Sequence, residues 1–477
     1  MKIFFCDKYN QTDTLVTLNI KGGNNTNPLK SFPDILKKLN LTGSHNEKST
    51  LLDIDCFSKI HILGAGKLLK KQSLRNIGGK IYNIAKNDEN IQVSVEGLSQ
   101  HDIAQIAYGL ILGSYSFTKY KTVKNKSATL KKVSFVGENS SEAKKCFNNL
   151  NCIAEGVFLA RDLVNEPANV LTPEKFVKTA KELSKLGINV KILNESQLKK
   201  FGMNALLAVG QGSANKSYVA VMEYMGTNKS ENPFVFVGKG VTFDTGGISL
   251  KPSSGMEDMK FDMGGASAVI GAMKAISLRK AKANVVGVLG LVENMPDGLA
   301  QRPGDVVTSM SGQTIEVINT DAEGRMVLAD CLTYVQKKYK PRSIIDLATL
   351  TGAMMVALGH EYAGVFANDD ELKQSIIDAG DSEIEGLWSM PMNKKYNMEI
   401  NSEIADMKNT GSKWGGACTA AAFLRRFIND DISWAHLDIA GMAWEYKGNP
   451  TVPKGGVGFG VRTLDRLVWD WERSVKK

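Results

Sequence analysis

Continuous apolar runs in the carboxyl-terminal part of the chain restrict its fold more than any other feature of the sequence. A strand with one solvated face alternates apolar and polar residues, whereas these runs have few polar interruptions. Strands of this kind belong to a sheet that helices cover on both faces. Helical patterns, such as "TPEKFVKTAKELSKLG" at 172–187, lie between them, so the sequence predicts a large α/β unit with a mixed sheet flanked by helices. The runs are "YVAVMEYM" (218–225), "PFVFVGKG" (233–240), "ANVVGVLGLV" (283–292), "SIIDLATL" (343–350) and "WAHLDIAG" (434–441).

The length of 477 residues points to at least two domains, because a single hydrophobic core seldom grows beyond about 250–300 residues. Residues 1–150 alternate short apolar strands with helical patterns, which predicts an α/β amino-terminal domain. Residues 151–167 have apolar residues at helical spacing and end in Pro167, which predicts a connecting helix. The larger domain then covers residues 168–477.

Positive charge is concentrated in the amino-terminal domain. The chain has a net charge of +9, and residues 1–150 carry 22 Lys and Arg against 12 Asp and Glu. A basic domain can bind nucleic acid through its phosphates. However, the lysines are dispersed through polar loops without interleaved aromatic residues, and a general preference for Lys and Asn explains them better. A nucleic-acid partner is therefore the less favoured interpretation.

The cysteines and the apolar runs favour a cytoplasmic protein without membrane association. The six cysteines are scattered and form no CxxC pair, which is typical of reduced thiols rather than of a disulfide framework. The longest apolar run, at 284–292, has about half the length that a membrane helix needs. The amino terminus has too few apolar residues before Asp7 for a secretion signal.

Two segments place charged residues beside glycines at the ends of predicted strands, at 237–265 and 318–325. Four carboxylates converging in an apolar domain would repel one another, and a pair of divalent cations is the simplest compensation. The five histidines show no metal-binding spacing, so an oxygen-rich site for Mn²⁺, Mg²⁺ or Zn²⁺ is expected. The charged residues are Lys239, Asp244, Lys251, Asp262, Asp321, Glu323 and Arg325.

The turn "INTDAEGR" at 318–325 also has a simpler interpretation. Acidic residues near a helix amino terminus complement the helix dipole, and Arg325 would then pair with one of them. The turn taken alone does not decide between a helix cap and a metal site. Its combination with the charged, glycine-flanked segment at 237–265 favours the metal site.

Several motifs resemble the leucyl aminopeptidase family of cytosolic dinuclear-metal peptidases. "NTDAEGR" (319–325), "VGKGVTFDTGGISLKP" (237–252) and "MKFDMGG" (259–265) carry the likeness most specifically. "LVNEPANVLTP" (163–173) and "DLATLTGA" (346–353) are also similar, and the resemblance extends over about residues 160–477. It implies an enzyme that releases amino-terminal, Leu-like apolar residues from peptides by attack of a metal-activated water.

The resemblance also implies a role for each metal-site residue. Asp244 and Glu323 would bridge two divalent ions, either Mn²⁺ or Zn²⁺. Lys239, as a neutral amine, and Asp262 would complete the tighter site. Asp321 would complete a more exchangeable site, where Mg²⁺ is an alternative. Because an ammonium cannot ligate a metal, Lys239 would have to lose its proton.

Two charged residues are implied to be catalytic rather than metal ligands. Lys251 would stabilise the oxyanion, and Arg325 would hold a bicarbonate that acts as general base. The family likeness further implies a homo-oligomer, a hexamer, that acts on peptides with a free amino terminus. A two-metal phosphoesterase remains as an alternative enzyme. The residues implied to line the substrate pocket are Met259, Thr349, Leu350, Gly352 and Ala440.

Overall fold

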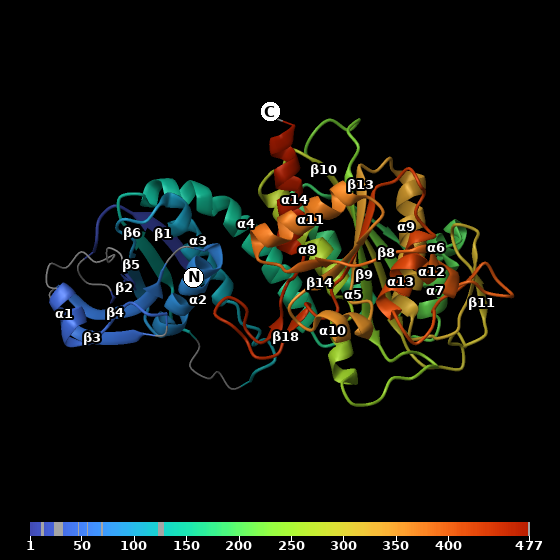
Figure 1. Ribbon diagram of the computed structural model, residues 1–477, viewed down its shortest axis with the longest axis horizontal. Helices are drawn as coiled ribbons and strands as arrows, with labels where there is room; N and C mark the ends of the chain where they lie inside the picture. Colours follow the sequence, from blue (N-terminus) through green and yellow to red (C-terminus); the bar gives the residue numbers. More distant parts are fainter. Residues whose placement is uncertain are drawn as a thin grey trace. The chain divides into compact units, whose positions relative to one another are not determined.

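The computed structural model describes residues 1–10, 14–22, 32–45, 47–54, 56–67, 70–122 and 128–475, and it divides the chain into two compact units (Figure 1). The first contains Met1–Ala154 and Tyr446–Lys454, and the second contains Glu155–Glu445 and Gly455–Lys477. The helix expected at 151–167 is the carboxyl-terminal part of a longer helix, α4 (Ser140–Asn165), which contains the first boundary between the units.

The amino-terminal unit is built on a six-stranded sheet with the order β1-β6-β5-β2-β4-β3. All its strand pairs are parallel except the β3–β4 pair. Apolar side chains of the strands pack against two helices, α2 and α3, which confirms the α/β character of this part. The elements are β1 (Lys2–Cys6), β2 (Thr14–Ile20), α1 (Phe32–Lys38), β3 (Lys48–Ile54), β4 (Phe57–Gly66), α2 (Lys71–Ala85), β5 (Asn90–Ser94), α3 (Gln100–Gly113) and β6 (Lys132–Val136).

The larger unit is built on an eight-stranded mixed sheet with the order β15-β14-β17-β13-β9-β10-β8-β7. The central strands β17, β13, β9 and β10 run parallel, and antiparallel pairs flank them on both sides. The expected fold class is thereby confirmed. The strands are β7 (Asn189–Leu193), β8 (Tyr218–Met225), β9 (Phe234–Asp244), β10 (Asn284–Asn294), β13 (Ser343–Ala348), β14 (Ala363–Ala367), β15 (Leu387–Ser389) and β17 (Trp434–Asp438).

Helices and two small sheets complete this unit. The small sheets have the orders β11-β12-β16 and β18-β19. Among the described residues, no helix combines the length and the apolarity that would let it cross a membrane. The remaining elements are α5 (Pro173–Glu182), η1 (Leu183–Leu186), α6 (Glu195–Phe201), α7 (Asn204–Gly210), η2 (Met256–Phe261), α8 (Gly264–Leu278), β11 (Val306–Thr308), β12 (Thr314–Glu316), α9 (Glu323–Lys338), α10 (Gly352–Leu358), α11 (Asp370–Glu383), α12 (Lys394–Glu399), β16 (Met407–Lys408), α13 (Gly416–Arg425), β18 (Trp444–Glu445), β19 (Gly455–Gly456) and α14 (Val461–Ser474).

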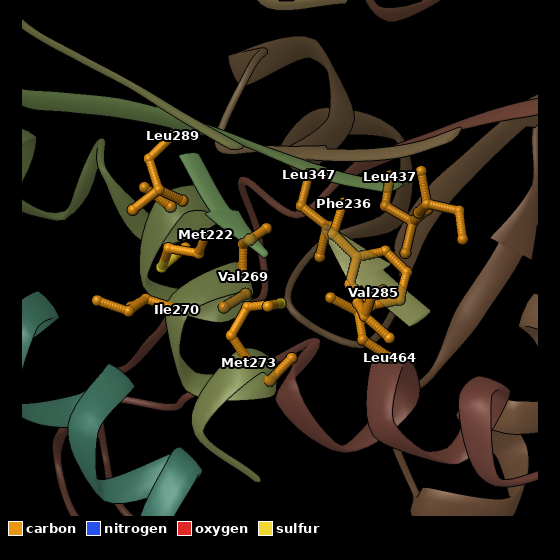
Figure 2. Packing of buried hydrophobic residues seen from close by; sticks show 14 of the residues in the cluster. Met222, Phe236, Val269, Ile270, Met273, Val285, Leu289, Leu347, Leu437 and Leu464 are labelled. Atoms are coloured by element: carbon orange, nitrogen blue, oxygen red, sulfur yellow. The ribbon is translucent and has the colours of Figure 1, made fainter. Parts of the chain in front are cut away.

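The central strand β9 explains why the apolar runs are continuous. Its side chains alternate between two hydrophobic cores, with Phe236 in one core and Val235 and Val237 in the other. Figure 2 shows the first core, where Phe236 lies among side chains that include Val269 of α8. Because helices cover both faces, neither side of the strand needs polar residues. Each such buried side chain contributes about 1.5–3 kcal/mol to stability.

The topology brings several strand ends to one edge of the sheet. Strands β9, β10 and β13 are parallel neighbours, so their carboxyl ends meet. Asp244 and Asn294 are the last residues of β9 and β10, and Thr349 follows β13 directly. Ligands of open α/β sheets bind outside the carboxyl ends of the strands. This edge is therefore where the charged segments are expected to meet.

Asp330, a fully buried residue near the middle of helix α9, links the helix to two neighbouring segments. Its carboxylate oxygens accept hydrogen bonds from the backbone N–H groups of Leu206 (2.9 Å) and Met310 (2.7 Å). Burial raises the pKa of the Asp330 carboxyl to about 7. The carboxyl of an unfolded Asp has a pKa of about 3.9, so the native protein binds this proton more tightly than the unfolded chain does.

The substitution Asp330→Asn is therefore expected to change how stability depends on pH. The stabilisation by the protonated carboxyl is complete below about pH 4 and is lost as the pH rises through about 7. Relative to the variant, wild type should lose up to about 4 kcal/mol between these pH values, measured by urea unfolding. Asp305→Asn is the control with the opposite trend, because hydrogen bonds from Arg302 lower the pKa of Asp305. Equal pH slopes for wild type and Asp330→Asn would contradict the prediction.

Candidate active site

Three buried carboxylates meet at the carboxyl edge of the large sheet. Asp244, Asp262 and Glu323 each present one oxygen, and these oxygens lie within 4.8 Å of one another. Asp244 ends β9, Asp262 follows the 3₁₀ helix η2, and Glu323 is the first residue of α9. The two charged segments predicted from the sequence, although far apart along the chain, thus form one cluster.

Lys239 of β9 lies between two of these carboxylates. Its Nζ is 2.7 Å from Asp262 Oδ1 and 2.8 Å from Glu323 Oε1, and it donates to the carbonyl oxygen of Thr349 at 3.0 Å. Burial disfavours the ammonium, but the charges of Asp262, Glu323 and Asp244 outweigh burial and raise the pKa of Lys239. Lys239 is therefore an ammonium ion when these carboxylates have no other cation to balance them.

A second lysine holds the more open side of the cluster. Lys251 forms ion pairs with Asp244 Oδ2 (2.8 Å) and with Asp321. The side chain of Asp321 is 33 % exposed, whereas that of Lys239 is 3 % exposed. Burial, followed by the negative charge of Asp244, raises the pKa of Asp321 to about 6. The Asp321 end of the cluster is thus the one that solvent reaches.

Neighbouring groups orient the carboxylates but leave one oxygen without a protein partner. Asp244 Oδ1 accepts from Gly246 N (2.9 Å) and from Asn294 Nδ2 (2.8 Å). Asp262 Oδ1 accepts from Thr349 Oγ1 at 2.8 Å, in addition to its contact with Lys239. The other oxygen of Asp262, Oδ2, is buried and has no hydrogen-bond partner among the described residues. A buried acceptor of this kind can be satisfied by an ion or an ordered water.

These groups fit divalent metal ions. Carboxylate oxygens suit Mn²⁺ and Mg²⁺, and they also bind Zn²⁺. The unpartnered oxygen of Asp262 is an available ligand atom inside the cluster. The Lys239 amine can become a further ligand once its proton leaves, which makes metal binding stronger as the pH rises.

Arg325 lies on the first turn of α9, two residues after Glu323. Its Nη1 donates to the backbone carbonyl of Asn409 at 2.9 Å, whereas its buried Nε has no hydrogen-bond partner in the part of the chain that the structure describes. Burial lowers the pKa of the guanidinium to about 10, so it keeps its charge at neutral pH. A buried guanidinium with an unused N–H is suited to bind a planar anion.

Gly324, between Glu323 and Arg325, leaves space for the lysine. A Cβ at Gly324 would lie 2.5 Å from Lys239 Cε and 2.8 Å from Lys239 Nζ, which is closer than atoms can approach. The substitution Gly324→Ala is therefore expected to displace the amine. Overpacking costs about 1–3 kcal/mol, so the affinity for Mn²⁺ should fall about 5- to 150-fold, measured by isothermal titration calorimetry.

The matched control for this substitution is Gly298→Ala. A Cβ at Gly298 meets no atom within 4 Å, and the backbone there does not have a positive φ. The control should bind Mn²⁺ as wild type does. Unchanged Mn²⁺ affinity in Gly324→Ala would show that the Lys239 amine tolerates displacement.

Of the residues expected to line the substrate pocket, Thr349 and Met259 contact the cluster, and Leu350 and Ala440 share a hydrogen-bond partner, Asp438. Thr349 contacts both Lys239 and Asp262, as described above. The backbone N–H groups of Leu350 and Ala440 both donate to Asp438 Oδ1, each at 3.2 Å. Met259 is linked to the cluster through its carbonyl, which accepts from Asp262 N at 3.3 Å.

Gly352, the remaining residue of that set, begins α10. A Cβ built at Gly352 would meet no atom within 4 Å, so open space lies beside it. The Oγ1 of Thr351 donates to Asp438 Oδ2 at 2.6 Å, which fixes the start of the same helix. Asp438 thus connects the Leu350 and Ala440 loops to the amino-terminal end of α10.

The sequence interpretation missed several residues that shape the cluster: Asn294, Gly324, Asn409 and Asp438. Asn294 and Asp438 end the apolar runs of β10 and β17, so a polar residue at a strand end was an available signal. Gly324 stands inside the recognised turn "NTDAEGR". Asn409 carries no such signal, because its flanking strand is only two residues long.

Comparisons with known proteins agree with this geometry. Residues 158–465 match the model of the cytosol aminopeptidase family, catalytic domain, and residues 30–124 match that of its N-terminal domain. A probable cytosol aminopeptidase from Bradyrhizobium is 52% identical over 421 residues, which cover 86% of this chain and 84% of that protein. One from Caulobacter vibrioides is 54% identical over 378 residues, 78% of this chain and 76% of that protein.

Solved structures show the same likeness. A mutant of tomato leucine aminopeptidase has a TM-score of 0.87 and 34% sequence identity, covering 98% of this chain and 96% of that one. The bottromycin maturation enzyme BotP in complex with Mn has a TM-score of 0.87 and 31% identity, covering 96% of this chain and 99% of that one. The protein therefore belongs to the cytosol aminopeptidase family of metal-dependent exopeptidases.

Proposed function

We propose that the protein releases amino-terminal, preferentially apolar residues from peptides, and that it does so with two divalent ions bound in the carboxylate cluster. The single observation that carries the proposal is the buried group of Asp244, Asp262 and Glu323 with the Lys239 amine between them. An ammonium balances these carboxylates in the absence of metal, and metal ions balance them when bound.

Each ligand residue has a place in this proposal. Asp244 and Glu323 would hold both ions, and Lys239 and Asp262 would complete the tighter site. Asp321 would complete the more exchangeable site, and its greater exposure supports that assignment. We expect Mn²⁺ or Zn²⁺, with Mg²⁺ as an alternative in the exchangeable site. Bound ions of this kind polarise a carbonyl and lower the pKa of water.

The two catalytic roles fall to Lys251 and Arg325. Lys251 is partly exposed on the open side of the cluster, where its ammonium can donate to the oxyanion that develops on the substrate carbonyl. Arg325 presents a buried, unpartnered Nε, and we propose that it holds a bicarbonate that serves as general base. His436 lies in the segment "WAHLDIAG" and is buried. Its Nδ1 pairs with Asp346 Oδ1 at 2.6 Å, and it does not belong to the carboxylate cluster.

The proposed pocket for the first side chain is apolar. Met259 and Leu350 are half-buried and pack at the margins of the two hydrophobic cores, and Gly352 borders open space. Thr349 and Ala440 complete the proposed lining. A lining of Met, Leu, Gly and Ala suits a medium-sized apolar side chain such as leucine.

The cellular setting follows from the relatives rather than from the site. The similar bacterial proteins are named cytosol aminopeptidases, and we propose that this protein also acts in the cytosol. We propose a homo-hexamer on the family resemblance alone, and light scattering after size exclusion tests it. A nucleic-acid role of the basic amino-terminal unit stays the less favoured proposal.

The proposed function is tested with purified protein, Mn²⁺ and leucine amide. The protein should hydrolyse the amide, a chelator should abolish the hydrolysis, and amino-terminal acetylation of a peptide should block its cleavage. Hydrolysis of a phosphate ester in place of the peptide would favour the phosphoesterase alternative. Equal rates on free and acetylated peptides would refute cleavage that is anchored at the amino terminus.

A further inference from the structure

Asn409 uses every one of its polar groups in a fully buried position. Its backbone N–H donates to Glu316 O (2.9 Å), and its carbonyl accepts from Arg325 Nη1 (2.9 Å). Its side-chain Oδ1 accepts from the N–H groups of Ile318 (2.8 Å) and Asn319 (3.3 Å), and its Nδ2 donates to Asn319 O (2.6 Å). One residue thus contacts both the metal-binding turn and Arg325.

The side-chain amide of Asn409 makes the backbone hydrogen bonds that a neighbouring strand would otherwise make. Strand β12 ends at Glu316, and its parallel partner β16 ends at Lys408, so the backbone that follows has no sheet pairing. Backbone N–H and C=O groups beyond the end of a sheet lack strand partners, and the amide of Asn409 supplies partners to Ile318 and Asn319. The turn beyond is therefore held by an amide from a segment some 90 residues away in sequence.

Asn409 is itself firmly placed. The residues before it form β16, and Asp406 Oδ2 accepts from Thr314 N at 2.7 Å at the start of β12. Arg426 Nη1 donates to the carbonyl of Asp406 at 3.1 Å. These contacts fix the β12–β16 pair on the side opposite the turn, so Asn409 cannot shift without disturbing the small sheet.

The turn that Asn409 holds leads directly into the cluster. Asn319 Oδ1 accepts from Asp321 N at 2.8 Å, and Ala322 N donates to Asn319 O at 3.1 Å. A movement of Asn319 would therefore move Asp321. The backbone carbonyl of Asn409 in turn accepts from the guanidinium of Arg325.

We propose that Asn409 is a positioning residue that sets the placement of Asp321 relative to Arg325. This inference rests on the proposed function, since it assigns those two side chains to the metal site and to the reacting group. Asn409 lies in neither of the charged segments. Its effect passes through the backbone of the turn and through Arg325.

The first test is Asn409→Ala. Removing the amide releases the turn, and a misplacement of about 1 Å in a catalytic constellation costs about 100-fold in rate. We expect kcat to fall about 100-fold while KM changes less than about threefold. The Mn²⁺ concentration that gives half of the metal-induced rise in Tm should increase about tenfold, because Asp321 loses its support.

Asn368→Ala is the matched control. The side chain of Asn368 also bridges two backbone groups, donating to Ile432 O (2.9 Å) and accepting from Trp434 N (2.8 Å), but it lies in a loop after β14. Its loss should lower Tm and leave kcat and the Mn²⁺ dependence unchanged. The same pattern in Asn409→Ala, a lower Tm with wild-type kcat and Mn²⁺ dependence, would overturn the proposal.

Asn409→Asp covers the case in which the alanine variant does not fold. A carboxylate keeps the accepted bonds from Ile318 and Asn319 but cannot donate to Asn319 O, whereas a protonated carboxyl can. The kcat of this variant, relative to wild type, should therefore rise as the pH is lowered from 8 to 6. A ratio that is constant over this range would refute the proposal.

If wild-type protein with Mn²⁺ cleaves no peptide, the proposed function fails, and the Mn²⁺ dependence of Tm still tests Asn409.

Discussion

Glu323→Gln is expected to remove the bound metal and at least about 10³-fold of kcat/KM, which corresponds to about 4 kcal/mol of transition-state stabilisation. Glu323 is buried, and its Oε1 lies 2.8 Å from Lys239 Nζ within the carboxylate group. The glutamine has nearly the same shape but no charge, so it can balance neither the lysine nor an ion. Metal content after dialysis, measured by inductively coupled plasma mass spectrometry, should fall below two ions per chain.

Glu385→Gln is the control for this experiment. Glu385 is also buried and accepts from Arg462 Nε (3.0 Å) and Thr463 N (2.9 Å), in contacts that do not involve the carboxylate group. We expect the control to lose stability and to keep its metal and its kcat. If Glu323→Gln retains two ions per chain and wild-type kcat/KM, the carboxylate cluster is not the metal site.

Lys251→Met is expected to lower kcat about 10²- to 10³-fold and to leave the metal in place. The reason is that Lys251 would act on the charge that develops in the transition state, and removal of one such donor typically costs about that factor. KM should change little, because the donor acts on the transition state rather than on the bound substrate. The loss of a positive charge beside Asp244 and Asp321 should keep or increase the affinity for Mn²⁺.

Steady-state kinetics with leucine amide and calorimetric titration with Mn²⁺ measure these two effects separately. Lys274→Met is the control. Lys274 lies on α8, its Nζ pairs with Glu155 of α4 at 2.9 Å, and it does not contact the cluster. It should behave as wild type in both measurements. A variant at Lys251 that loses metal and activity together would instead assign Lys251 to metal binding.

Much of the large sheet was predictable because its strands are buried on both faces. The runs at 218–225, 233–240, 283–292, 343–350 and 434–441 correspond to β8, β9, β10, β13 and β17. The segment "TIEVI" at 314–318 was expected to be a strand and contains β12, whereas β11 and β16 were not predicted, since two or three residues show no periodicity. The segment Tyr446–Lys454 belongs to the amino-terminal unit, and no local pattern indicates which core a distant loop joins.

The site was predictable to the extent that its residues stand in charged, glycine-flanked segments. Lys239, Asp262 and Glu323 do meet, as do Lys251, Asp244 and Asp321, and their assignment as ligands and catalytic residues remains a proposal. The domain limits drawn at 150 and 167 are likewise sequence expectations. In the structure residue 150 lies inside α4, and residue 167 lies just beyond its last residue, Asn165.

The sequence by itself identified the charged side chains that meet in the cluster, because buried strands, glycines and clustered charges are visible as patterns of neighbouring residues. Only the tertiary structure decided how those side chains are held. Asn409 reaches Arg325 across 84 residues, and Asn294 reaches Asp244 across 50. A buried side-chain amide can satisfy backbone groups that have no strand or helix partner. Which backbone groups lack a partner is decided only when the chain has folded.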